Sequence, residues 1–282
     1  MAFKLLNGKD VAKKIRNTLK SEIEKLKKKP NLTVVLVGNN PASLIYVKNK
    51  EKYANEVGMK SELIKLPENT TEEKLLKLIK KLNKDKKVNG ILVQLPLPKQ
   101  INEFNIINAI SPLKDVDGFT VENKGLLSIG KPNLVPCTPL GILELLKFYN
   151  IKIEEKNVVV VGRSNIVGKP ISQLLLNENA TVITCHSYTK NLKDITTKAD
   201  ILISAVGKEN LITKNHVKEN SVVIDVAMIR DVKNNCWKGD VKFNEVAPKT
   251  KFITPVPGGI GPMTIAMLLQ NTLTAYKKQN KK

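Results

Sequence analysis

The sequence has few of the residues that build metal centres and disulfide frameworks. Its 282 residues include three cysteines and two histidines, and no two cysteines form a CxxC pair. The odd, widely spaced set of Cys137, Cys185 and Cys236 predicts neither a disulfide scaffold nor a zinc site, and it fits a reducing, cytoplasmic compartment. Because His186 and His216 are the only histidines, no histidine cluster can form, and we expect no metal site.

Long apolar segments are absent as well. No run approaches the roughly 18–20 apolar residues that cross a bilayer, and the first residues, MAFKLLNGKDV, lack the apolar core of a secretory signal. Hydrophobic residues make up 41% and charged residues 26% of the chain, which is ordinary for a globular protein of one or two domains. We therefore expect no membrane partner.

Arginine and aromatic residues are scarce, and this bears on the high positive charge. The formal net charge is +21, a value that would suit nucleic-acid binding. However, only Arg16, Arg163 and Arg230 are arginines, the lysines are spread along the whole chain, and aromatics make up 4%, too few for a base-stacking platform. We favour a solvated lysine-rich surface that attracts anionic substrates and binds no nucleic acid. Salt-dependent DNA binding without enzyme activity would favour the alternative.

Segments of strand and helix length alternate along the chain, a pattern that predicts an α/β protein with parallel sheets. Expected strands span residues 32–38, 61–66, 89–98, 157–162, 181–185, 199–207, 221–226 and 251–256. Expected helices span residues 9–28, 41–57, 71–83, 168–176 and 261–277. Residues 111–141 are rich in proline, glycine and aspartate and are typical of a junction.

The segment VVVVGRSNIVGKP predicts a dinucleotide site. It is a buried strand followed by a turn at Gly162 and a helix that starts near Gly168. Such a turn directs the N-terminal amides of the helix toward a pyrophosphate. The spacing is not GxGxxG, so an ordinary strand-to-helix turn stays open on this motif alone.

The end of the next strand favours NADP over NAD. NAD sites carry an acid there that binds the ribose hydroxyls, but this strand ends in CHSYTK, which contains none. Ser187 lies there beside His186 and Lys190, and Arg163 can approach from the first turn. Arginine and serine would bind a 2′-phosphate that a carboxylate would repel. A solvated strand end is the alternative for His186 and Lys190.

Lys50 occupies an unusual position on the expected helix 41–57. At about 100° per residue, it falls on one stripe with Tyr46, Val47 and Ala54, while Lys48 falls on the opposite side. A lysine on a mostly apolar face is desolvated and suited to proton transfer near neutral pH. A lysine snorkelling at the edge of the core is the alternative.

Polar residues at two other places add to this pattern. Gln94 interrupts the apolar strand GILVQLPLP, and Asp115 and Asp117 lie in a tight turn before Gly118. A purely structural explanation is open for each of them. Gln94 can be a buried amide with its hydrogen bonds formed within the core, and aspartate is favoured in turns such as the one that contains Asp115 and Asp117.

Six motifs together are more specific than any one of them: VGNNPASLIYVKNK (37–50), GILVQLPLP (90–98), PLKDVDGF (112–119), PCTPLG (136–141), GRSNIVGKP (162–170) and TPVPGGIGPMT (254–264). Nearly end to end, the chain resembles the bifunctional methylenetetrahydrofolate dehydrogenase/methenyltetrahydrofolate cyclohydrolase family. The resemblance implies NADP-dependent oxidation of 5,10-methylenetetrahydrofolate to 5,10-methenyltetrahydrofolate, followed by hydrolysis to 10-formyltetrahydrofolate. A monofunctional NAD(P)-dependent methylenetetrahydrofolate dehydrogenase is the alternative.

The resemblance also implies roles for single residues. The catalytic residues would be Lys50, which moves protons, Gln94, which tunes Lys50, Tyr46, which orients the folate ring, and Asp117, which grips the pterin. The substrate site would add Leu95, Pro257, Gly258 and Gly259. The cofactor site would consist of Gly162, Arg163, Ser164, Ser187, Thr138 and Met228.

For the fold, the resemblance implies two α/β domains with a cleft between them. Residues 1–120 would form a folate-binding catalytic domain completed by a final helix, 262–280, and residues 140–260 a Rossmann-like NADP-binding domain, with a junction at 121–139. Members of the family are commonly homodimers. One departure stands out, because the family usually has DVGIN where this chain has DVAMIR (225–230), with Ala227 for glycine and Ile229 for asparagine. This difference bears on cofactor affinity more than on the reaction class.

Overall fold

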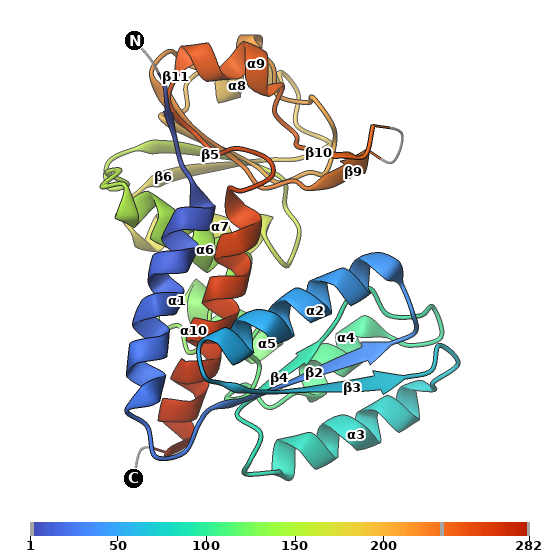
Figure 1. Ribbon diagram of the computed structural model, residues 1–282. Coiled ribbons are helices and arrows are strands. Elements are labelled where there is room, and N and C mark those ends of the chain that lie inside the picture. Colours follow the sequence, from blue (N-terminus) through green and yellow to red (C-terminus); the bar gives the residue numbers. More distant parts are fainter. Residues whose placement is uncertain (1–2, 232–233, 281–282) are drawn as a thin grey trace. The chain divides into compact units, whose positions relative to one another are not determined.

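The computed structural model describes residues 3–231 and 234–280, which form two compact units (Figure 1). Residues 3–13 and 138–264 form one unit, here called the six-stranded domain. Residues 14–137 and 265–280 form the other, the three-stranded domain. Each domain thus combines segments that are far apart in the sequence.

The six-stranded domain contains a parallel sheet with the strand order β1-β11-β8-β7-β5-β6. Its strands are β1 (Lys4–Leu5), β5 (Asn157–Val161), β6 (Thr181–Cys185), β7 (Ile201–Ser204), β8 (Ser221–Asp225) and β11 (Thr250–Ile253). A separate antiparallel hairpin consists of β9 (Ile229–Asp231) and β10 (Cys236–Lys238). The helical segments are α6 (Cys137–Phe148), α7 (Gly168–Asn177), α8 (Leu192–Thr196), α9 (Phe243–Val246), η1 (Lys214–His216) and η2 (Ala247–Lys249).

The central strands of this sheet are almost wholly apolar, as expected of parallel strands covered on both faces. Val159 and Val161 of β5 are buried in one cluster with Leu202 of β7 and Val223 of β8. The sequence did not predict β1, which pairs in parallel with β11. A strand of two residues is too short to show an alternating pattern.

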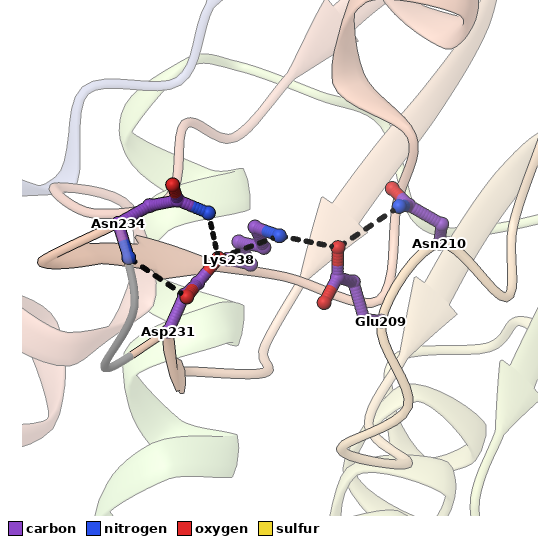
Figure 2. Close-up of polar contacts among 5 residues, drawn as sticks. All are labelled: Glu209, Asn210, Asp231, Asn234 and Lys238. Atoms are coloured by element: carbon purple, nitrogen blue, oxygen red, sulfur yellow. Dashed lines mark hydrogen bonds and ion pairs between the residues drawn. The ribbon is translucent and has the colours of Figure 1, made fainter.

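An ionic network ties the β9–β10 hairpin to the segment that follows β7 (Figure 2). The Lys238 ammonium lies 2.8 Å from a carboxylate oxygen of Asp231 and 2.8 Å from one of Glu209. Asn234 donates to Asp231, and Asn210 donates to Glu209. The hydrogen bond from Lys238 holds the pKa of Asp231 well below its ordinary value.

The three-stranded domain is built on a parallel sheet with the strand order β3-β2-β4. Its strands are β2 (Asn31–Val37), β3 (Lys60–Leu66) and β4 (Gly90–Val93). Its helices are α2 (Pro41–Glu56), α3 (Glu72–Lys84), α4 (Glu103–Ala109) and α5 (Val121–Ser128), together with most of α1 (Gly8–Glu24) and of α10 (Ile260–Asn280). In Figure 1, α2 and α3 lie on opposite faces of this sheet.

Two clusters form the core of the three-stranded domain. On one face of the sheet, Val35 and Val93 pack with Ile79 of α3 and Ile106 of α4. The second cluster joins three helices, because Leu19 and Ile23 of α1 and Ala54 of α2 are buried with Leu269 and Leu273 of α10. The last helix therefore returns to the first half of the chain, as the resemblance implies.

The proline-rich segment 111–141 contains more regular structure than its composition indicates. Thr120 caps α5 by accepting a hydrogen bond from the Asn123 amide, and α6 begins at Cys137. Contacts assign residues 121–137 to the three-stranded domain and residues 3–13 to the six-stranded domain. Within residues 3–231 and 234–280, no helix combines the length and the apolar character needed to cross a membrane.

Candidate functional site

A lysine and a glutamine form the centre of the candidate site in the three-stranded domain. Lys50 lies on the third turn of α2 and Gln94 directly follows β4, and the Lys50 ammonium donates to Gln94 Oε1 at 2.9 Å. The Gln94 side chain is itself held, because its Nε2 donates to the Leu95 carbonyl at 2.7 Å. Its backbone amide donates to the Val35 carbonyl at 2.9 Å. The glutamine is therefore a fixed acceptor for the lysine.

The stripe expected on α2 is present. Val47 and Ala54 are buried, Lys50 is partly buried, and Lys48 and Lys52 on the other side are exposed. Tyr46, one turn before Lys50, keeps 37% of its surface exposed. The helix thus presents Tyr46 at a surface and Lys50 at the edge of the core, where its charge is only partly hydrated.

Asp117 lies near Lys50 in the same domain. Burial raises the pKa of Asp117 to about 6, and the Lys50 charge opposes this shift. The neighbouring Asp115 has a different task, because its buried carboxylate accepts hydrogen bonds from the Thr120 amide at 2.8 Å and from Asn123 Nδ2 at 2.9 Å. Of the two acids in the DVDG turn, Asp115 holds the turn together, and Asp117 is the one left to interact with Lys50.

The turn between β5 and α7 has the geometry of a phosphate-binding turn. Gly162 has φ +122°, and a Cβ on Gly168 would lie 2.2 Å from the Gly162 carbonyl oxygen, so both positions require glycine. The Ser164 hydroxyl accepts from the Val167 and Gly168 amides at 3.2 and 3.3 Å. Ser164 therefore stabilises the turn that leads into the N-terminus of α7.

Arg163 and the end of β6 come together beside this turn. The Arg163 guanidinium lies 5.7 Å from the centre of the Tyr188 ring, and Ser187 precedes Tyr188 in the chain. Arg163, Ser187 and Lys190 are exposed. The His186 ring accepts from the Tyr188 amide through Nδ1 at 3.2 Å, so this histidine shapes the turn. Exposed basic and hydroxyl groups beside a helix N-terminus can bind a phosphate.

The remaining predicted residues of the six-stranded domain lie around the start of α10. Met228 lines a small pocket together with Pro257, Gly258 and Gly259. The Gly258 carbonyl accepts from the Lys9 amide at 3.0 Å, which holds this loop to the N-terminus of α1. The Thr138 hydroxyl lies 2.9 Å from that of Thr264. The contacts thus place the predicted residues of the six-stranded domain in two sets, one at the β5–α7 turn and the end of β6, and the other near the start of α10.

Two buried carboxylates that sequence reasoning missed hold the loops at the carboxyl ends of β7 and β8. Asp225 accepts from the backbone amides of Ala227, Asp240 and Val241 at 2.9–3.1 Å. Asp240 accepts from the Ser204 hydroxyl and from two backbone amides, at 2.7–2.8 Å. Burial raises the pKa of Asp225 to about 6. The available signal for Asp225 was its place directly after the apolar run Val222–Ile224 of β8.

Ala227, which stands where the family usually has glycine, fits its place. It is not among the residues with positive φ, it is buried, and its amide donates to Asp225. An alanine is compatible with this backbone conformation, so the departure causes no strain there.

Two domain models of one protein family together match most of the chain. Residues 6–117 match the catalytic domain of tetrahydrofolate dehydrogenase/cyclohydrolase, and residues 136–280 match the NAD(P)-binding domain of the same family. The bifunctional protein FolD of Agathobacter rectalis is 55% identical over 277 residues, which cover 97% of this chain and 99% of the relative.

Solved structures agree with these matches. The bifunctional FolD methylenetetrahydrofolate dehydrogenase/cyclohydrolase of Campylobacter jejuni has a TM-score of 0.97 and 48% identity, covering 98% of this chain and 99% of its own. The Trypanosoma brucei enzyme, solved with NADP and an inhibitor, has a TM-score of 0.95 and 36% identity, and the match covers 100% of both chains.

Proposed function

Because this chain belongs to the tetrahydrofolate dehydrogenase/cyclohydrolase family, we propose that the polar residues of its two domains divide the work of two consecutive folate reactions. It is a bifunctional enzyme that oxidises 5,10-methylenetetrahydrofolate with NADP and then hydrolyses the methenyl product to 10-formyltetrahydrofolate. The bifunctional relatives favour this reading over a monofunctional dehydrogenase.

The observation that carries the assignment of roles is the hydrogen bond between Lys50 Nζ and Gln94 Oε1 at 2.9 Å. In hydrolysis, water adds to the methenyl carbon and loses one proton. The carbon–nitrogen bond then breaks as the hydroxyl of the adduct loses its proton, the formyl C=O forms, and the ring nitrogen gains a proton. A lysine at the edge of the core can take up and return these protons. Gln94 keeps the amine of Lys50 in one place while it does so.

Asp117 and Tyr46 serve binding in this proposal. The Asp117 carboxylate accepts hydrogen bonds from the N–H groups of the pterin, and its proximity to Lys50 brings the pterin next to the proton-transfer group. Tyr46, partly exposed one turn from Lys50, offers its ring for stacking on the substrate. Leu95, together with the segment Pro257–Gly259, contributes backbone and apolar contacts to the folate.

The residues of the six-stranded domain fit NADP. Gly162 and Gly168 allow the tight turn that brings the N-terminus of α7 to a pyrophosphate, and Ser164 stabilises that turn. Arg163 and Ser187 provide donors for a 2′-phosphate, and residues 185–190 contain no carboxylate that would repel it. Thr138 and Met228 complete the cofactor site. NADP, when bound, accepts the hydride of the first reaction.

Two further proposals concern the state of the protein in the cell. We propose a homodimer, as is common in the family, which sedimentation velocity would test by the mass of the particle. We also propose a cytoplasmic location, since Cys137, Cys185 and Cys236 are all free thiols. Cell fractionation with an antibody would test it.

The decisive experiment for the function is a spectrophotometric assay of methylenetetrahydrofolate oxidation with NADP and NAD in parallel, coupled to detection of 10-formyltetrahydrofolate. We expect both reactions, with a lower KM for NADP. Oxidation without formation of 10-formyltetrahydrofolate would contradict the bifunctional assignment.

A further inference from the structure

The three-stranded domain contains a buried amide to which the two reactions assign no role. Asn271 lies on α10 with 4% of its surface exposed. Its Nδ2 donates to the Val116 carbonyl at 2.9 Å and to the Val135 carbonyl at 2.8 Å. One side chain of the last helix therefore joins two separate segments. Val116 directly precedes Asp117, and Val135 lies two residues before Cys137.

The two segments are in close contact beyond this amide. Gly118 has φ +69°, and a Cβ there would lie 2.6 Å from the Pro136 nitrogen, so only glycine allows the approach. Since Asn271 fixes Val116 and this contact fixes Gly118, the backbone on both sides of Asp117 is held against the segment 135–136.

The Cys137 thiol contacts the same carbonyl as Asn271. It is buried, and its Sγ donates to the Val116 carbonyl at 3.2 Å. The same Sγ lies 3.6 Å from Asn271 Nδ2. A carbonyl oxygen has two lone pairs and can accept from both side chains. Two side chains from other segments therefore fix the Val116 carbonyl, one residue before Asp117.

We propose that Asn271 and Cys137 are positioning residues of the folate site: both hold the backbone carbonyl of Val116, directly before Asp117, and so place the Asp117 carboxylate. This inference rests on the proposed role of Asp117 in gripping the pterin. Buried polar side chains far apart in sequence often orient a functional group in this way. Neither residue touches the substrate in this scheme, and both act through Asp117.

The first test is Asn271→Ala, with steady-state kinetics for both substrates. We expect the KM for methylenetetrahydrofolate to rise about tenfold, the effect of misplacing roughly one hydrogen bond to a charged group. The KM for NADP should stay within about twofold, because Asn271 acts in the other domain. The matched control is Thr272→Ala, the next residue on α10, which is fully buried and whose hydroxyl bonds only to the Leu268 carbonyl of its own helix. Thr272→Ala should lower the melting temperature without this change in KM.

The second test keeps the inference falsifiable even if Asn271→Ala does not fold. Cys137→Ser retains a donor of similar size and should keep the folate KM near that of the parent protein, whereas Cys137→Ala should raise it. Equal folate KM values for the serine and alanine variants would overturn the role of Cys137. An unchanged folate KM in a folded Asn271→Ala variant would overturn the role of Asn271.

A double-variant cycle separates this inference from the proposed function. If Asp117→Asn leaves the folate KM unchanged, the assigned role of Asp117 is wrong. If Asp117→Asn raises the folate KM, then Asn271→Ala added to it should have little further effect, because both changes act on the same contact. Independent, multiplicative effects would show that Asn271 does not act through Asp117.

Discussion

The two groups of site residues are held in different ways. In the three-stranded domain the side chains hold one another: Lys50 donates to Gln94, and Asp117 is partly buried beside Lys50. In the six-stranded domain the backbone shapes the candidate cofactor site, through the turn between Gly162 and Gly168, while Arg163 is exposed. On the proposed roles, we expect substitution of Lys50 to change the chemistry and substitution of Arg163 to change the affinity for the cofactor.

The largest expected effect separates chemistry from cofactor binding. Lys50→Met should lower the cyclohydrolase rate at least about 100-fold, because it removes the group that we propose transfers protons. The KM for NADP should change little. The control is Lys48→Met on the exposed side of the same helix, which should keep both activities. A Lys50→Met variant that hydrolyses methenyltetrahydrofolate at the normal rate would show that another residue does this work.

The next effect concerns affinity alone. Arg163→Ala should raise the KM for NADP by about 10–100-fold, the range expected for losing charge-assisted hydrogen bonds to a phosphate. The KM for NAD, which lacks the 2′-phosphate, should change much less. Lys251→Ala removes one positive charge from an exposed position on β11 and serves as the control. Equal effects of Arg163→Ala on the two cofactors would refute the 2′-phosphate contact.

A smaller effect should be seen in stability as a function of pH. Burial raises the pKa of Asp117 from 3.8 to about 6 in the folded protein. Between these values the folded state binds the proton that the unfolded state releases, so ionisation costs the folded state free energy as the pH rises. Relative to Asp117→Asn, the free energy of unfolding should therefore fall between about pH 4 and pH 6, by at most roughly 3 kcal/mol. Denaturant titrations of both proteins across this range measure it, and parallel curves would contradict the shift.

The smallest effect tests the unusual DVAMIR segment. Ala227→Gly restores the residue common in the family, yet the backbone there is already compatible with alanine. We expect the KM for NADP to stay within about twofold and the stability to fall by about 0.5–1 kcal/mol, because glycine loses more conformational freedom on folding. A large gain in NADP affinity would mean that the alanine weakens the cofactor site.

Much of the fold follows from local sequence patterns. The strand at 181–185 has the bounds predicted for it, and helix α2 ends one residue before its predicted end. Thr71 caps α3, as Thr and Glu near its start indicate. The prediction was weakest at two places. In residues 111–141 the proline and glycine content predicted an irregular junction in place of α5, and at β1 two residues are too few to show a periodic pattern. In both places, contacts with distant segments stabilise the structure.

In the candidate site, too, local features could be predicted and contacts between distant segments could not. The turn VGRSNIVGKP and the side of α2 that carries Lys50 could be predicted because each lies within one continuous segment. The roles of Asp225 and Asp240 could not, because each carboxylate accepts bonds from backbone amides of other segments. Sequence spacing does not indicate which amides these will be.

By itself, the sequence placed Lys50 on the apolar stripe of a helix and predicted the strand–turn–helix unit around Gly162, since side-chain type and helical period are local properties. Only the tertiary structure decided that Gln94 faces Lys50, that Asp115 holds the turn while Asp117 is left to interact with Lys50, and that Asn271 of the last helix secures that turn. These choices depend on hydrogen bonds between segments up to 155 residues apart. Such bonds form only when the packing of the core has brought the segments together.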